Sequence, residues 1–142
     1  MEIPININYI NKIGSLFPTD LKTSNPIYHI QYDKAPMPYT LDLTLALVAF
    51  ELNRDYVIHI TIICSDGETK IDEDLNLSGS KLNRDNVIDN SNLSSTTFSI
   101  KTRPFIINQG INQYMTSITL KDAQTGQIFD SMTTWFITEP QI

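Results

Sequence analysis

The sequence predicts an all-β protein, an antiparallel β-sandwich of about seven to eight strands. The first observation is alternation: from Leu41 to Ala49 every odd position is apolar. Successive side chains of a strand point to opposite faces, so this pattern gives one continuous apolar face. The second is the density of β-branched residues in 56–64, which pack well on a pleated surface. The third is the short spacing of turn signals, with Asp66-Gly67 as a hairpin signal.

Residues 41–49, 56–64 and 69–77 follow one another as three predicted strands, which we interpret as an antiparallel meander with one buried face. Leu, Ala and Glu favour a helix by propensity. However, the leucines of the first segment recur every two residues, whereas a helix needs apolar residues at three- and four-residue spacing. The same alternation predicts further strands at 26–33, 96–102, 114–121 and 127–138.

Two segments are less regular, although we interpret 1–142 as a single domain. Residues 1–25 predict an extended arm or an edge strand, because Pro4 stands within the alternating start and proline is confined to strand edges and ends; within them we expect a loop from residue 14. Residues 78–95 are rich in Asn, Ser and Asp and predict a long polar loop. Inside that loop we expect a turn at 83–85 and a short pairing at Val87-Ile88.

The net charge of -6 argues against a nucleic-acid partner, because phosphate binding needs clustered Lys and Arg and the ten basic residues are scattered. No apolar run approaches the roughly 20 residues of a membrane span. A single cysteine suits a reducing compartment, and the N-terminus lacks the basic start and apolar core of a signal peptide. We therefore expect a cytoplasmic protein without a membrane partner.

Catalytic residues are hard to assemble from this sequence. Nucleophilic catalysis needs a Ser, Thr or Cys beside a base, commonly His. Both His29 and His59 fall within predicted strands, and Cys64 has the opposite parity to His59, which disfavours a dyad within that strand. The glycines are dispersed and form no phosphate-binding loop. The sequence predicts no enzyme and no cofactor.

Metal ligands are equally sparse. Asp72 and Asp74 belong to the densest acidic cluster and are a weak calcium candidate, since calcium takes carboxylate oxygens. The EF-hand spacing and the Cys/His patterns of zinc sites are absent from the sequence. A solvated strand whose charges protect a sheet edge explains the cluster better. We therefore predict no metal.

Aromatic residues give the remaining candidate site. Trp135 and Tyr114, together with Phe105, could line a face that binds a sugar or a peptide. The alternative, which we favour, is that Trp135 and Tyr114 pack in the sandwich core, where aromatic side chains bury large areas.

The segments LDLTLALVAFE and VIHITIICSDG, with the later Gly110-Ile-Asn-Gln-Tyr114, resemble small uncharacterised bacterial or phage-associated β-sandwich proteins. This resemblance implies a fold and no activity. With no catalytic constellation and with sheet edges open to strand addition, the sequence predicts a non-enzymatic binding or assembly module for a protein partner or a second copy of the chain. The alternatives are a carbohydrate- or peptide-binding module with an aromatic face, and a hydrolase using His59 or His29 with residues 78–95 as a lid.

Overall fold

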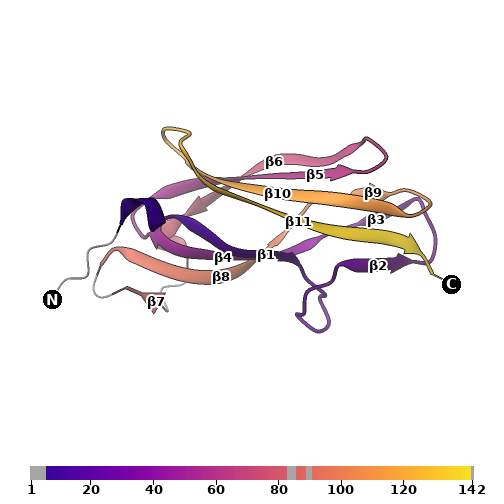
Figure 1. Ribbon diagram of the computed structural model, residues 1–142, viewed down its shortest axis with the longest axis horizontal. Helices are drawn as coiled ribbons and strands as arrows, with labels where there is room; N and C mark the ends of the chain where they lie inside the picture. The colour runs from indigo at the N-terminus through magenta and orange to yellow at the C-terminus, as the bar shows by residue number, and fades with distance from the viewer. Residues whose placement is uncertain (1–5, 83–85, 89–90, 142) are drawn as a thin grey trace.

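Figure 1 shows the computed structural model, in which the strands run along the long axis of the molecule. The structure describes residues 6–82, 86–88 and 91–141. The strands are β1 (Lys12–Pro18), β2 (His29–Tyr32), β3 (Met37–Tyr39), β4 (Asp42–Glu51), β5 (Asp55–Cys64), β6 (Thr69–Ser78), β7 (Asn86–Val87), β8 (Leu93–Lys101), β9 (Phe105–Ile107), β10 (Asn112–Asp122) and β11 (Ile128–Pro140). Two 3₁₀ turns are η1 (Ile7–Tyr9) and η2 (Gly79–Lys81). None of the described helices is long and apolar enough to cross a membrane.

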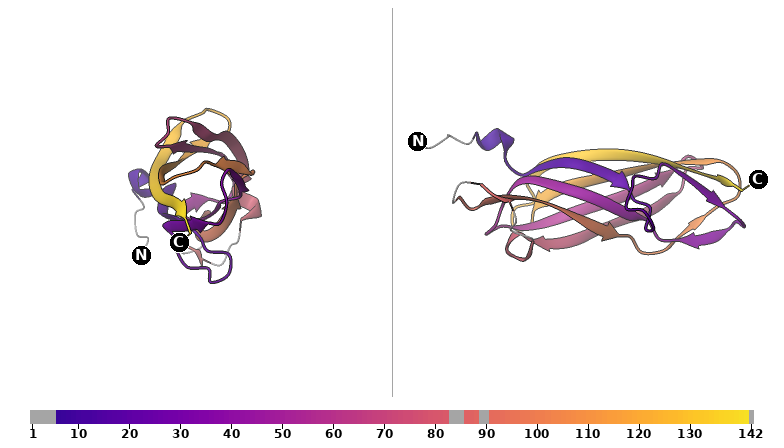
Figure 2. Two further views of the ribbon diagram at one scale, coloured as in Figure 1. Left: turned by 90° about the vertical axis from the view of Figure 1, so that its right-hand side faces the viewer. Right: turned by 90° about the horizontal axis from the view of Figure 1, so that it is seen from below.

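Two main sheets pack around a common core, as the end-on view of Figure 2 shows. One has the order β1-β4-β8-β7 and the other the order β2-β11-β10-β5-β6, and β3 pairs with β9 in a small third sheet. The pairings are antiparallel except that β2 runs parallel to β11. The predicted all-β sandwich is confirmed. The short strands β3, β7 and β9 come in addition to the strands that alternation predicts.

The predicted three-stranded meander is wrong in one respect. Strands β5 and β6 form the expected hairpin, but β4 belongs to the opposite sheet, where it pairs with β1 and β8. The chain crosses between the sheets at Glu51–Asp55, a turn closed by the Arg54 amide donating to the Glu51 carbonyl at 3.2 Å. A polar turn after an alternating strand occurs equally in a hairpin and in such a crossing, so only the distant partner strands distinguish them.

The apolar face of β4 is the centre of the core. Leu43, Leu45 and Leu47 are buried, as the alternation predicts. The register then shifts between Leu47 and Phe50, where Ala49 takes a positive φ of 55°. A β-bulge adds one residue to a strand and interrupts its alternation. Ala49 and Phe50 are therefore both buried although they are neighbours.

The two less regular segments contain strands. Strand β1 lies at the edge of the four-stranded sheet, within the range 1–25, and it occupies Lys12–Pro18, where we expected a loop from residue 14. The range 78–95 holds η2, β7 and the start of β8, and Val87 pairs with Ser94. The expected turn at 83–85 lies outside the described residues.

Candidate functional site

The long hairpin of β10 and β11 positions the most exposed aromatic surface of the five-stranded sheet. Its turn is held by Asp122, whose Oδ1 accepts from the amides of Gln124 at 2.7 Å and Thr125 at 3.2 Å. Gly126 closes the turn with a φ of 75°, a conformation in which an L side chain would be strained. The resulting register sets Trp135 opposite Met115.

The two adjacent aromatic residues of β11, Trp135 and Phe136, point to opposite faces of the sheet. Phe136 is buried and stacks on Tyr114 with ring centroids 4.5 Å apart and planes at 4°. Because side chains alternate along a strand, Trp135 must then point outward, and its exposed fraction is 57%. The expectation that Trp135 packs in the core is wrong. Both parities of β11 contain apolar residues, and the stacking of Phe136 on Tyr114 decides which one faces inward.

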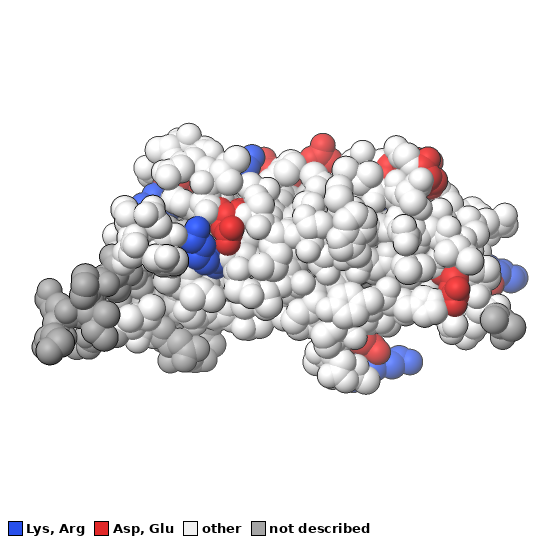
Figure 3. Space-filling model, in the orientation of Figure 1, with Lys and Arg blue, Asp and Glu red and all other residues white. Residues whose placement is uncertain are grey.

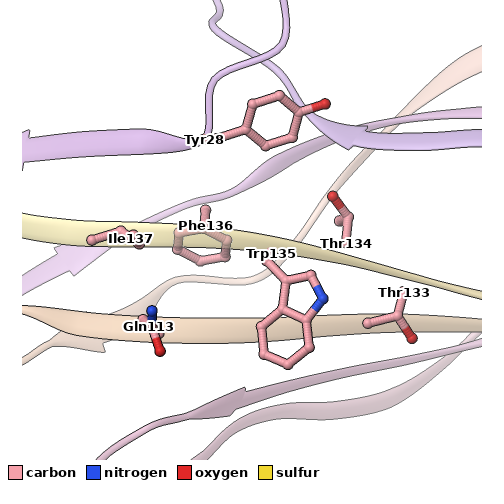
Figure 4. Close-up of a pocket in the computed structure, with 7 residues that line it drawn as sticks. All are labelled: Tyr28, Gln113, Thr133, Thr134, Trp135, Phe136 and Ile137. Carbon is pink, nitrogen blue, oxygen red and sulfur yellow. The ribbon is translucent and has the colours of Figure 1, made fainter.

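Trp135 lies in an open depression of about 470 Å³ on the outer side of this sheet (Figure 4). Its indole extends over β10 on the side of Gln113, while Tyr28 stands on the other side of β11. Tyr28 precedes β2 and is also exposed. The lining residues are Tyr28, Gln113, Thr133, Thr134, Trp135, Phe136 and Ile137.

None of the residues that line this depression carries a formal charge. The polar groups there are hydroxyls and one side-chain amide, and the Thr133 hydroxyl hydrogen-bonds to that of Ser117 on β10 at 3.0 Å. In Figure 3 the central part of the displayed face carries no coloured side chains. A pocket of aromatic surface with a few polar groups is the usual form of a small-ligand site.

The other two aromatic candidates do not join Trp135. Tyr114 and Phe105 are buried, and their ring centroids lie 6.3 Å apart in the core. Burial raises the pKa of the Tyr114 phenol to about 12, and the Thr138 hydroxyl donates to its oxygen at 3.4 Å. Both residues therefore support the sheet from inside and leave Trp135 as the surface aromatic of the three.

Sequence reasoning missed Tyr28 and Gln113 as neighbours of Trp135. Tyr28 shares its parity with Ile30 and Tyr32, which are buried, so alternation alone groups it with side chains of the core. It escapes burial because strand β2 begins only at His29. Gln113 lies on β10 opposite Ile137, a pairing that only the register of the hairpin reveals.

The acidic pair Asp72 and Asp74, the weak calcium candidate of the sequence, contacts a histidine. His59 lies on the outer face of β5, and its imidazole contacts two carboxylates of the neighbouring strand β6. Its Nε2 is 2.9 Å from Asp72 Oδ1, and its Nδ1 is 2.6 Å from Asp74 Oδ1. In the described part of the chain no group of three or more His, Cys, Asp or Glu side chains is arranged to hold a metal ion.

The predicted separation of Cys64 from His59 is confirmed. Cys64 is buried, and burial raises the pKa of its thiol, whereas His59 points outward on the same strand. His29 lies elsewhere on the outer face, with its Nε2 2.8 Å from Glu139 Oε1. A thiolate nucleophile is disfavoured by the raised pKa.

A second, polar pocket lies at the end of the sandwich where β4 crosses to β5, lined in part by Glu51, Arg54 and Asp122. Arg54 donates to both carboxylates, and its guanidinium lies 5.2 Å from the ring centre of Phe129. Behind it the Tyr56 hydroxyl donates to Asn11 Oδ1 at 2.5 Å and accepts from the Glu51 amide at 2.7 Å. These groups satisfy one another across both sheets, which indicates a structural role.

This network predicts sensitivity to acid. Burial alone would raise the pKa of Glu51, but hydrogen bonds from Arg54 and Asn11 outweigh it and lower that pKa. The Gln124 amide, with the Thr125 amide and Arg54, lowers the pKa of Asp122. Carboxyl groups with lowered pKa values stabilise the fold above the pKa of the unfolded chain and lose that contribution as pH falls.

We therefore expect the free energy of unfolding to fall as the pH drops from about 5 to 3. The measurement is urea unfolding at several pH values. An Arg54→Met variant should be less stable near neutral pH and show a shallower loss over this range, because the Glu51 and Asp122 pKa values return toward ordinary ones. Arg103→Met, which removes an exposed pair with Glu73, is the control. Equal slopes in all three proteins would contradict the prediction.

Solved structures with a similar fold include parts of much larger proteins. The chain is similar to two structures of β-glucuronidase from Bacteroides uniformis, one of them covalently bound to cyclophellitol-6-carboxylate aziridine, each with a TM-score of 0.52 and 13% identity over 84% of this chain. A putative β-galactosidase from Bacteroides fragilis gives a TM-score of 0.48 and 14% identity over 88% of this chain. The chain spans only 12% of the length of the two β-glucuronidase chains. At this identity the likeness establishes the fold alone.

No protein-family model and no curated protein sequence matches the chain. The resemblance to small bacterial or phage-associated β-sandwich proteins accordingly stays a prediction.

Proposed function

We propose that this protein is a non-enzymatic carbohydrate-binding module whose binding surface surrounds Trp135. The observation that carries the proposal is the indole, 57% exposed, in an uncharged depression on the outer face of the five-stranded sheet. A large aromatic side chain left in water costs hydrophobic free energy, and exposed apolar patches commonly mark binding sites.

Carbohydrate fits this lining better than a charged ligand. A sugar ring offers an apolar C–H face for stacking on the indole and hydroxyls around its rim. Gln113 and Thr133 stand beside the indole, and a side-chain amide and a hydroxyl both donate and accept hydrogen bonds. Tyr28 adds a second exposed ring in the same depression. The likeness to part of the two β-glucuronidase structures adds only that this fold occurs within a protein named for a carbohydrate substrate.

Association through sheet edges, the other function that the sequence predicts, has less support. The outer edge strand β6 carries Asp72, Glu73 and Asp74, and charged side chains on an edge discourage strand addition. Of the other edge strands, β2 and β7 are short, and β1 contacts β11 of the other sheet. Binding of a protein partner or of a second copy of the chain is the alternative that the test below distinguishes.

Trp135 is the only tryptophan in the chain, so intrinsic fluorescence reports directly on the proposed site. We expect red-shifted, solvent-exposed emission that moves to shorter wavelength when a bound sugar covers the indole. A panel of neutral oligosaccharides titrated under fluorescence and calorimetry is the measurement. Covering a large apolar side chain contributes about 1.5–3 kcal/mol, so Trp135→Ala should weaken binding by about 10- to 150-fold.

The matched control is Tyr9→Ala, because Tyr9 is also exposed and aromatic but lies in η1, outside the depression. This variant should bind as the wild type does. Unchanged emission with the whole panel and no heat of binding would overturn the proposal. Light scattering that shows a concentration-dependent dimer, with emission shifting on dimerisation, would favour self-association instead.

A further inference from the structure

The apolar surface at Trp135 continues across two more strands. Cross-strand pairing sets Met115 of β10 opposite Trp135 and Ile63 of β5 opposite Met115. Side chains directly opposite on neighbouring strands share a face and lie close enough to touch. Trp135 and Ile63 are exposed and Met115 is half-buried. We call these three side chains the apolar strip.

Uncharged polar side chains border the strip along one side. The next row contains Thr133, Ser117 and Thr61 on the same three strands, and the first two share a hydrogen bond. In the following row the Ser131 hydroxyl donates to that of Thr119 at 3.2 Å. The strip therefore runs beside a band of hydroxyl groups, perpendicular to the strands.

The far end of this hydroxyl band is acidic. Asp72 is paired with Thr61 in register, and Asp74 with His59. Both carboxylates contact the single imidazole of His59, so two acidic groups share one basic partner, and each aspartate side chain is 61% exposed. An anionic ligand that lies along the band would approach these carboxylates, and like charges at short range repel.

We propose that the apolar strip is an extended subsite for an uncharged oligosaccharide that lies across β11, β10 and β5, with one sugar ring on Trp135 and the following rings over Met115 and Ile63. Neighbouring strands are about 4.8 Å apart, so the strip is about 10 Å long between its outer strands, enough for a second and a third ring. The hydroxyl band faces the rims of those rings, and Asp72 and Asp74 disfavour uronate or sulfated chains. This inference rests on the carbohydrate-binding function proposed above.

The test compares a neutral mono-, di- and trisaccharide of one sugar with the corresponding uronic acid oligomer, by calorimetry and Trp135 fluorescence. Affinity should rise at least threefold with each added neutral ring. Met115→Ala and Ile63→Ser should lower trisaccharide affinity several-fold, and by a larger factor than they lower monosaccharide affinity. Ile106→Ser is the matched control, because Ile106 is similarly exposed but lies on β9, and it should bind as the wild type does.

The possible results separate this inference from the function on which it rests. If sugars bind and Trp135→Ala weakens binding as expected, yet affinity is independent of chain length and is unchanged in the Met115 and Ile63 variants, the extended subsite is refuted and the carbohydrate site stands. If the uronic acid trimer binds as tightly as the neutral one, the charge selectivity is refuted. If no sugar binds at all, both proposals fail.

Discussion

A Gly79→Ala variant is expected to lose more than about 2 kcal/mol of its free energy of unfolding. Gly79 begins η2 and packs against the turn where β4 crosses to β5. A methyl group on its Cα would overlap the Glu51 carbonyl oxygen and lie 3.0 Å from that of Arg54. Both obstacles are backbone atoms, and the Gly79 amide also donates to the Arg54 carbonyl at 2.9 Å. The clash therefore cannot be relieved by a change of rotamer, and the crossing between the sheets must shift.

Urea unfolding measures this effect, with Gly14→Ala as the matched control. A methyl group at Gly14 would meet Val48 Cγ2 at 2.8 Å, but Val48 is a partly exposed side chain that is free to move. We expect this control to lose far less stability than Gly79→Ala. Similar unfolding midpoints for the two variants would show that the crossing tolerates a side chain and would contradict the prediction.

The long central strands could be predicted because a period of two describes most of their length. In β5 the buried residues Tyr56, Ile58, Ile60, Ile62 and Cys64 alternate with the outward His59 and Thr61 as expected. Sheet membership could not be predicted in the same way. Whether β4 pairs with β5 or with β8 depends on contacts between residues about 50 positions apart in sequence, such as Leu45 and Phe98, and local patterns carry no information about them.

In the candidate site, too, residue type could be read from the sequence, whereas contacts between strands could not. Trp135 was singled out from its residue type, but its exposure depends on the stacking of Phe136 on Tyr114, a contact between two strands. The acidic pair Asp72 and Asp74 was recognised as a cluster, yet its partner His59 comes from the neighbouring strand. Residue type thus suggested candidates, and register decided which of them share a surface.

The polar range 78–95 illustrates where composition misleads. Its Ser and Asn content predicts a loop, but Leu93 and Ser94 are buried at the start of β8. Ser94 pairs with Phe50 of β4 beside the bulge, and the Leu52 amide donates to the Asn92 carbonyl at 2.7 Å. A sheet position can accept a small polar residue when neighbouring strands supply the apolar surface, so a strand of this kind lacks the alternation that would reveal it.

A Leu45→Ala variant is expected to lose about 2–5 kcal/mol, the cost of deleting a buried leucine in a close-packed core. Leu45 lies in the middle of β4, between β1 and β8, and is fully buried. Its side chain belongs to the core cluster that joins the two main sheets, so truncation opens a cavity between layers that the paired strands hold apart. Thermal and urea unfolding are the measurements.

Val48→Ala on the same strand is the control, because Val48 is partly exposed on the opposite face. Surface substitutions of this kind usually change stability by less than about 0.5 kcal/mol. A small loss of stability in Val48→Ala and a large loss in Leu45→Ala would show that only the inner face of β4 is buried. Comparable losses at both positions would mean that the outer face of this sheet is covered in solution, since a side chain loses substantial free energy on truncation only where it is buried. Recording both variants across a range of protein concentrations distinguishes that case, because stability that depends on self-association rises with concentration.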